Sequence, residues 1–279
     1  MNKENKVKNV LFTVWVLIAF LLIQVGGSLP IIITKAVSAL MAAGGDMNLY
    51  IETYTASLAE IGTLAEVVST VVSLVAAFIW FMVGYRKFYS PEEKAEGRKF
   101  VKNPLTIVMM ITGTLAIYSF DVLLASLTAA LSPASEEFYS TMMDIALGGS
   151  PVLAWITLAI LAPINEELIF RGIILRKSSK AFTKVLPIIL VQAILFGIMH
   201  LNPIQSIYAM VIGLFLGYIA YKSKSVIPSI LLHALNNIVA DSANYWPEAL
   251  RSVVAFAIYF VVLGAVTVFL FIKVNKKAE

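Results

Sequence analysis

The sequence predicts an all-α, polytopic membrane protein folded as a helix bundle. Its 279 residues are 59% hydrophobic and only 14% charged, whereas soluble domains are about 45–50% apolar and about 25% charged. Several apolar runs approach the length of about 20 residues that an α-helix needs to cross a bilayer. The Lys and Arg residues lie mainly between these runs, on alternate connections. Lipid is therefore the solvent of most of the chain.

Eight apolar runs, bounded by charged residues or by Gly and Pro, are the predicted transmembrane helices. Each run is expected to be helical, because backbone groups in lipid must form their hydrogen bonds within the segment. Residues 34–60 are expected to be a long outer connection, with a helical part on the membrane surface. Residues 1–279 are expected to form a single integral membrane domain. The eight spans are residues 10–33, 61–85, 104–124, 151–175, 185–201, 204–221, 226–240 and 252–272.

The distribution of basic residues predicts a multi-pass protein of the cell membrane with both termini in the cytoplasm. With the N-terminus inside, 18 of the 21 Lys and Arg residues fall on cytoplasmic segments, which are normally enriched in these residues. Only Lys35 and Arg251 fall on the opposite side, and Arg171 lies in the fourth span. No basic tract or arm accompanies the net charge of +4, so the partner is the lipid bilayer and not nucleic acid.

Four ionisable side chains fall inside the apolar spans and are candidate functional residues. They are Glu166 and Glu167 in the fourth span, His200 at the end of the fifth and His233 in the seventh. An ionisable group at the bilayer centre costs at least about 2.5 kcal/mol, and such groups usually serve a function. We therefore expect these four residues to form a site.

Three pairs of residues in these spans have the spacing of four that places side chains on one helix face. The spacing of Glu167 and Arg171 predicts a structural ion pair. Glu166 points about 100° away from Glu167 and stays free for chemistry. Phe196 is expected to shape the pocket. The three pairs are Glu167 with Arg171, Phe196 with His200, and His233 with Asn237.

A free carboxylate, two imidazoles and an amide in a water-poor pocket suit the hydrolysis of a peptide bond. This reaction needs a base that activates water, and donors or a metal that stabilise the oxyanion. In one scheme Glu166 and His200 supply the base, while His233 and Asn237 face the oxyanion. In a second scheme Glu166, His200 and His233 bind zinc or another divalent metal with an open position for water. The spacing alone leaves both schemes open.

The three motifs are EExxxR at residues 166–171, FxxxH at 196–200 and HxxxN at 233–237. This set resembles the motifs of the CAAX-protease and bacteriocin-processing family (CPBP, Abi) of intramembrane proteases, which includes the Ras-converting CAAX endopeptidase. The resemblance covers about residues 150–240, the expected catalytic core. It implies an all-helical bundle, a metallo- or glutamate-dependent endopeptidase activity, and a membrane-associated protein or peptide as substrate.

The resemblance also implies a role for each motif. Glu166 matches the family's water-activating Glu, which works with His200. Glu167 and Arg171 match its structural ion pair. The two residues of the third motif, His233 and Asn237, match its oxyanion-stabilising or metal-binding pair. The first three spans carry no motif, so the resemblance does not identify the substrate.

Two other functions would use the same residues. In a proton-coupled transporter, Glu166, His200 and His233 would relay protons, although the chain lacks the obvious inverted repeat of many transporters. A non-catalytic membrane scaffold or immunity protein would keep only the fold. Two further carboxylates, Glu66 and Asp121, lie near the outer ends of their spans and are expected at the membrane interface.

Helix geometry predicts a conflict in depth between the site residues. At 1.5 Å per residue, Glu166 lies roughly 14 Å from the inner end of its span, His233 roughly 10 Å from the start of its span and His200 roughly 22 Å from the start of its span. Straight helices would therefore misalign the three side chains. A tilt, a helix distortion at Pro163 or Pro187, or an offset start of the fifth span is expected to bring them together.

Overall fold

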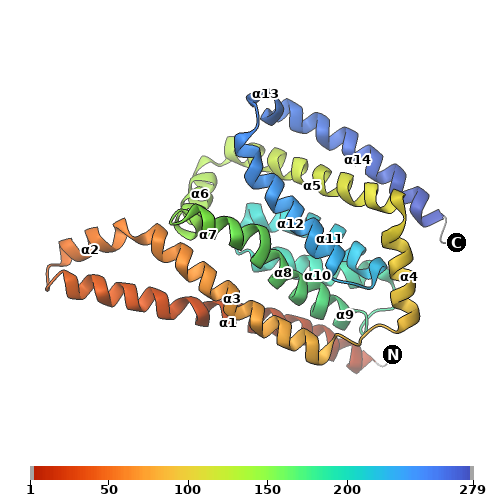
Figure 1. Cartoon of the computed structure of the whole chain (residues 1–279), viewed down its shortest axis with the longest axis horizontal. Helices are drawn as coiled ribbons and strands as arrows, with labels where there is room; N and C mark the ends of the chain where they lie inside the picture. The colour runs from red at the N-terminus through yellow and green to blue at the C-terminus, as the bar shows by residue number, and fades with distance from the viewer. Residues whose placement is uncertain (1–2, 277–279) are drawn as a thin grey trace.

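The computed structural model describes residues 3–276 and contains helices joined by short connections, with no β-strand in that range. Lys277, one of the basic residues counted at the C-terminal end, lies outside the described residues. Figure 1 shows the helices gathered into one bundle with a projecting arm. The predicted all-α helix bundle is confirmed. The helices outside the fourth predicted span are α1 (Lys3–Ala42), α2 (Met47–Ala56), α3 (Leu58–Gly84), α4 (Pro91–Lys102), α5 (Pro104–Leu131), α6 (Pro133–Leu147), α10 (Val185–Met199), α11 (Pro203–Ser223), α12 (Ile227–Ser242), η3 (Ala243–Tyr245), α13 (Glu248–Arg251) and α14 (Val253–Lys276).

The fourth predicted span forms one unbroken helical stretch with five parts. These parts are α7 (Pro151–Ile156), η1 (Thr157–Leu161), α8 (Ala162–Glu167), η2 (Leu168–Ile174) and α9 (Leu175–Ser178). We call this stretch, Pro151–Ser178, the central span, because Figure 1 shows it surrounded by other helices. Its residues Phe170, Ile173 and Ile174 have no exposed surface. A helix buried in this way can carry polar side chains without exposing them to lipid.

Each of the eight predicted spans corresponds to a helix, but only six described segments are long and apolar enough to cross a bilayer. The two others, α10 and α12, have 15 and 16 residues. At 1.5 Å per residue they cover roughly 22–24 Å, which is less than the bilayer core of about 30 Å. The six long segments are Glu4–Ala42, Leu58–Gly84, Pro104–Leu131, Pro151–Ser178, Pro203–Ser223 and Val253–Lys276.

Helix pairs pack along one another around the central span. α1 packs along α3, α10 along α11, and α5 along α14. Figure 1 shows both termini at the same end of the bundle, beside α4 and α9. This placement fits an even number of membrane crossings, which the sequence also predicts.

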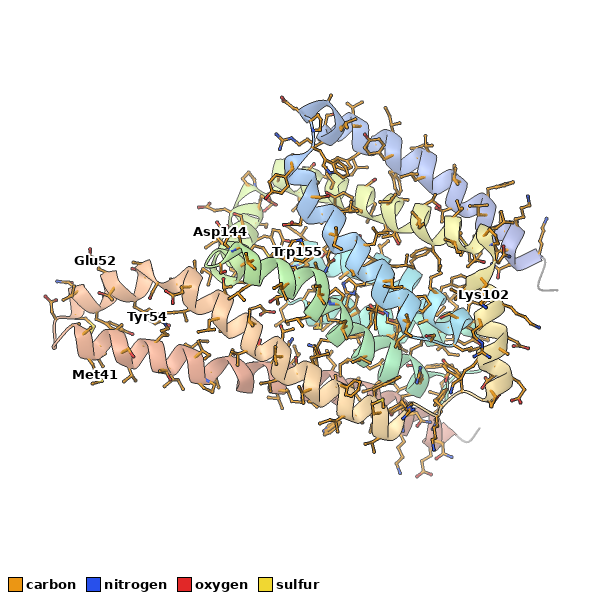
Figure 2. All side chains as sticks on the ribbon, in the orientation of Figure 1. Met41, Glu52, Tyr54, Lys102, Asp144 and Trp155 are labelled. Atoms are coloured by element: carbon orange, nitrogen blue, oxygen red, sulfur yellow. The ribbon has the colours of Figure 1, made fainter. Side chains whose placement is uncertain are left out.

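Residues 34–60, predicted as an outer connection, are largely helical and form the projecting arm. α1 continues through this region, the chain turns at Gly44 and Gly45, and α2 leads back towards α3. The two glycines have φ angles of +56° and +98°, which glycine adopts at little steric cost. Figure 2 shows Met41 and Tyr54 near the far end of this arm, away from the bundle.

The inner end of the central span is fixed by Arg176. The sequence placed this residue on a cytoplasmic connection, but its side chain is buried. Its guanidinium donates a hydrogen bond to the Tyr85 carbonyl oxygen and lies 4.8 Å from the Phe81 ring centroid and 4.9 Å from that of Tyr89. Cation–π contacts of this kind are favourable when the cation is removed from water. They join the central span to the end of α3 and the connection that follows it.

We predict that Gly62→Ala lowers stability by about 1–3 kcal/mol, the usual cost of overpacking. A Cβ at Gly62 in α3 would lie 1.9 Å from the Ile145 carbonyl oxygen of α6, and backbone atoms cannot move aside easily. Gly264→Ala in α14 is the matched control, because a Cβ there would meet nothing within 4 Å. Thermal unfolding in detergent, followed by tryptophan fluorescence, compares the two variants. Equal midpoints would contradict a close contact between α3 and α6.

Candidate active site

The central span departs from regular α-helix on both sides of the predicted site. η1 and η2 are π-helical segments, and α8 between them ends at Glu167. The Ala162 N–H donates to the Thr157 carbonyl oxygen, five residues back instead of four. π-Helical turns are rare and often occur at functional sites. Glu166 and Glu167 therefore lie in a locally distorted part of the helix.

Glu167 is completely buried and has partners on two helices. Its Oε1 accepts a hydrogen bond of 2.6 Å from Arg171 Nη1, and both side chains are 0% exposed. The ion pair predicted from the spacing of four is thus present. The same oxygen lies 3.0 Å from Nδ1 of His233 on α12, a contact that the sequence did not predict. Glu167 therefore joins the central span to α12.

Glu166 is less enclosed than its neighbour. Its Oε2 lies 3.8 Å from Nε2 of His233 and has no hydrogen-bond partner among the described residues. The Glu166 side chain is 15% exposed, whereas that of Glu167 is 0% exposed. His233 thus lies between the two carboxylates, with one ring nitrogen towards each. Of the two side chains, that of Glu166 is the more accessible.

Phe196 lies between the two histidines. Its ring centroid is 5.0 Å from that of His200 and 5.7 Å from that of His233, and both contacts are edge-on. The Arg171 guanidinium lies 4.5 Å from the same ring centroid. The Phe196 ring, one turn before His200, therefore contacts both imidazoles. The relative depth of Glu166, His200 and His233 stays a prediction.

The hydrogen-bond partners of the histidines determine their neutral tautomers. His200 Nδ1 lies 2.8 Å from the Phe196 carbonyl oxygen, and His233 Nδ1 faces the Glu167 carboxylate. Carbonyl and carboxylate oxygens only accept hydrogen bonds, so we infer that Nδ1 carries the proton in each ring. In both neutral histidines the Nε2 lone pair is then available to take a proton or bind a ligand.

Asn237 lies one turn after His233 and also faces the central span. Its Nδ2 donates a hydrogen bond of 2.8 Å to the Leu158 carbonyl oxygen in η1. Its Oδ1 accepts a weaker bond of 3.4 Å from Asn236 Nδ2. The two residues of the third motif therefore contact the central span at two separate levels.

The predicted metal ligands are Glu166, His200 and His233. These are the residue types of a catalytic zinc site. Within residues 3–276, however, no group of three or more His, Cys, Asp or Glu side chains is gathered closely enough to hold a metal ion. Metal binding by Glu166, His200 and His233 therefore stays a prediction.

Gln192 and the Gly213 carbonyl are parts of the site region that the sequence analysis missed. The Gly213 carbonyl oxygen on α11 accepts hydrogen bonds from Gln192 Nε2 at 2.8 Å and from Arg171 Nη2 at 3.3 Å. Gln192 is buried and is the single amide side chain within α10, which is a signal that could have drawn attention to it. No sequence pattern distinguishes the Gly213 carbonyl, because every residue has a backbone carbonyl group.

The polar face of α3 also borders the site. Asn165 Nδ2 donates a hydrogen bond of 2.6 Å to Ser73 Oγ. Glu66 Oε1 accepts one of 3.1 Å from Thr70 Oγ1. The second predicted span carries no motif, but its Glu, Thr and Ser at helical spacing could have indicated this face.

We predict that Arg171→Met lowers stability by about 3–5 kcal/mol, because it leaves the Glu167 carboxylate buried without its cation. Adding Glu167→Gln should recover part of this loss. The matched control is Lys35→Met, which breaks the exposed 3.2 Å ion pair with Glu60 and should cost at most about 1 kcal/mol. Denaturation midpoints in detergent measure all three variants. A loss with Arg171→Met as small as that with Lys35→Met would show that the pair is not buried.

A comparison with protein families found one match, which covers residues 148–239. The matching family is Rce1-like, described as type II CAAX prenyl endopeptidase Rce1-like. The matched segment begins just before α7, ends within α12 and includes Glu166, His200 and Asn237. Neither a curated protein nor a solved structure matched the chain. Residues 148–239 are therefore similar to the Rce1-like family, which supports the resemblance to the CAAX-protease family that the three motifs indicate.

Proposed function

We propose that this protein is an intramembrane endopeptidase in which Glu166 activates the water that cleaves a membrane-associated protein or peptide. The family of residues 148–239 supports a CAAX-type endopeptidase activity. One observation carries the assignment of the base: the Glu166 side chain is 15% exposed and faces His233 Nε2 without a hydrogen bond, whereas that of Glu167 is 0% exposed. The adjacent carboxylate, Glu167, is already held by Arg171.

In the proposed reaction, the Glu166 carboxylate takes a proton from a water molecule as the water oxygen attacks the peptide carbonyl carbon. Glu166 then gives this proton to the departing amide nitrogen as the carbon–nitrogen bond breaks. The products are a carboxylic acid and an amine, and Glu166 returns to its starting state. His200 Nε2, unprotonated when Nδ1 donates to the Phe196 carbonyl, is the second acceptor available to orient the water.

The attacked carbonyl oxygen gains negative charge and needs hydrogen-bond donors. When His233 carries both ring protons, its Nδ1–H stays with Glu167 and its Nε2–H is available on the side of Glu166. Asn237 is the second predicted donor. One of its two amide protons is already committed to the Leu158 carbonyl oxygen, so only the other is available for this role.

The chain is a multi-pass membrane protein, as its six long apolar helices and its family indicate. We propose that the membrane is the cell membrane and that both termini are cytoplasmic, because 18 of the 21 Lys and Arg residues fall on that side. The substrate would then meet the enzyme within or at the surface of the bilayer. No observation favours the proton-coupled transporter or the non-catalytic scaffold or immunity protein.

We predict that Glu166→Gln lowers the cleavage rate at least about 100-fold, since a positioned general base usually contributes that much or more. The unfolding midpoint should change little, because Glu166 has no hydrogen bond to lose. The assay follows a fluorogenic peptide with a farnesylated CAAX end in proteoliposomes. Glu60→Gln, in the exposed pair with Lys35, is the control and should cleave normally. Equal cleavage by wild type and Glu166→Gln would refute the assignment of the base.

The divalent metal predicted from Glu166, His200 and His233 has its own test. If these residues bind a metal, purified wild-type protein should contain about one equivalent per chain. His200→Ala and His233→Ala should lose it, and chelation should stop cleavage. Elemental analysis and the peptide assay check these outcomes together. A metal-free preparation that cleaves at the full rate with chelator present would rule out this ligand set.

A further inference from the structure

Pro163 lies in the interior of the central span, immediately after a change of hydrogen-bond register. The Ala162 N–H donates five residues back, to the Thr157 carbonyl oxygen. The donor that would follow in this register is the N–H of residue 163, and its acceptor would be the Leu158 carbonyl oxygen. Proline has no N–H. The Leu158 carbonyl oxygen therefore lacks the backbone donor that this register would give it.

A side chain from another helix takes the place of the missing donor. Asn237 Nδ2 donates to the Leu158 carbonyl oxygen at 2.8 Å, from 79 residues further along the chain. Proline is tolerated in membrane helices where neighbouring groups satisfy the backbone atoms that it frees. Asn237 on α12 meets this requirement.

The bond also fixes the position of a histidine. His233 and Asn237 are four residues apart and share one face of α12. The central span thus holds α12 at two levels, through Glu167 to His233 and through the Leu158 carbonyl to Asn237. Two such contacts restrict both the rotation and the axial shift of α12. They thereby keep His233 Nε2 at 3.8 Å from Glu166 Oε2.

We infer that Pro163 and Asn237 act as one positioning device: Pro163 keeps the Leu158 carbonyl oxygen free of a backbone donor, and Asn237 uses it to hold His233 beside Glu166. Pro163 thus acts on the site through the Leu158 carbonyl oxygen. The effect on catalysis rests on the proposed function, whereas the effect on α12 does not. In this device Asn237 is a positioning residue, which acts through His233 by way of the amide proton that it gives to the Leu158 carbonyl oxygen. Its other amide proton is the one proposed for the oxyanion.

The test is a double-mutant cycle with Pro163→Ala, Asn237→Leu and the double variant. Pro163→Ala supplies a backbone N–H, which lets the helix return to α register and satisfy the Leu158 carbonyl oxygen itself. Asn237→Leu keeps a similar volume without the donor. Each single variant should lower kcat about 10- to 100-fold, the scale of a misplacement near 1 Å, with KM nearly unchanged. The double variant should be no slower than the slower single variant, because both changes break one device.

Two control variants separate this device from general effects of the substitutions. Pro30→Ala removes the other proline inside a long apolar helix, α1, and should keep the wild-type kcat. Asn275→Leu removes a different interhelical amide bond, the 3.0 Å bond from Asn275 Nδ2 to Tyr218 Oη. It should lower the unfolding midpoint and leave kcat per folded molecule unchanged.

Hydrogen–deuterium exchange of the α12 peptide, residues 227–242, gives a readout that needs no substrate. Exchange should rise in both single variants and no further in the double variant. Wild-type kcat in Pro163→Ala, or losses in the singles that multiply in the double variant, would overturn the inference. Multiplying losses would show that Pro163 and Asn237 act independently of each other. If wild-type protein cleaves nothing, the proposed function fails, and the exchange data still decide whether the device exists.

Discussion

The site depends on one buried carboxylate, that of Glu167. A buried charge without a partner is strongly destabilising, so Glu167 needs Arg171 on its own helix. The same oxygen also faces His233 Nδ1, which sets the orientation of this imidazole and leaves its Nε2 towards Glu166. Breaking the ion pair would therefore disturb both the packing of the central span and the geometry of the proposed reaction. The fully buried glutamate is held by its ion pair, and its less enclosed neighbour Glu166 is the proposed base.

Lipid imposes a second constraint, because it offers no hydrogen bonds to a distorted backbone. The π-helical segments of the central span are tolerated because other helices surround it. The Leu158 carbonyl oxygen receives a donor from α12, and the Gly213 carbonyl oxygen receives two from the central span and α10. The two helices shorter than a bilayer crossing, α10 and α12, are the ones that place the histidines: His200 follows the last residue of α10, and His233 lies within α12.

Much of the fold and part of the site could be predicted from the sequence. Apolar runs indicated where helices form, since burial in lipid requires both apolar side chains and internal hydrogen bonding. The spacing of four between Glu167 and Arg171 predicted their ion pair, because both residues share one helix and its geometry is fixed. The bond between His233 and Glu167 escaped prediction. It joins two residues 66 positions apart and depends on how their helices rotate and slide against each other.

The sequence by itself determined an all-helical membrane protein, the residues able to do chemistry and their pairing within each helix. These properties follow from hydropathy and from a helical repeat of 3.6 residues, both of which act locally. Only the tertiary structure decided which carboxylate is enclosed, which ring nitrogen faces it and where Asn237 binds. Those outcomes depend on side-chain packing between helices and on the carbonyl left free by Pro163. The spacing of the motifs predicts neither the packing nor the change of helical register.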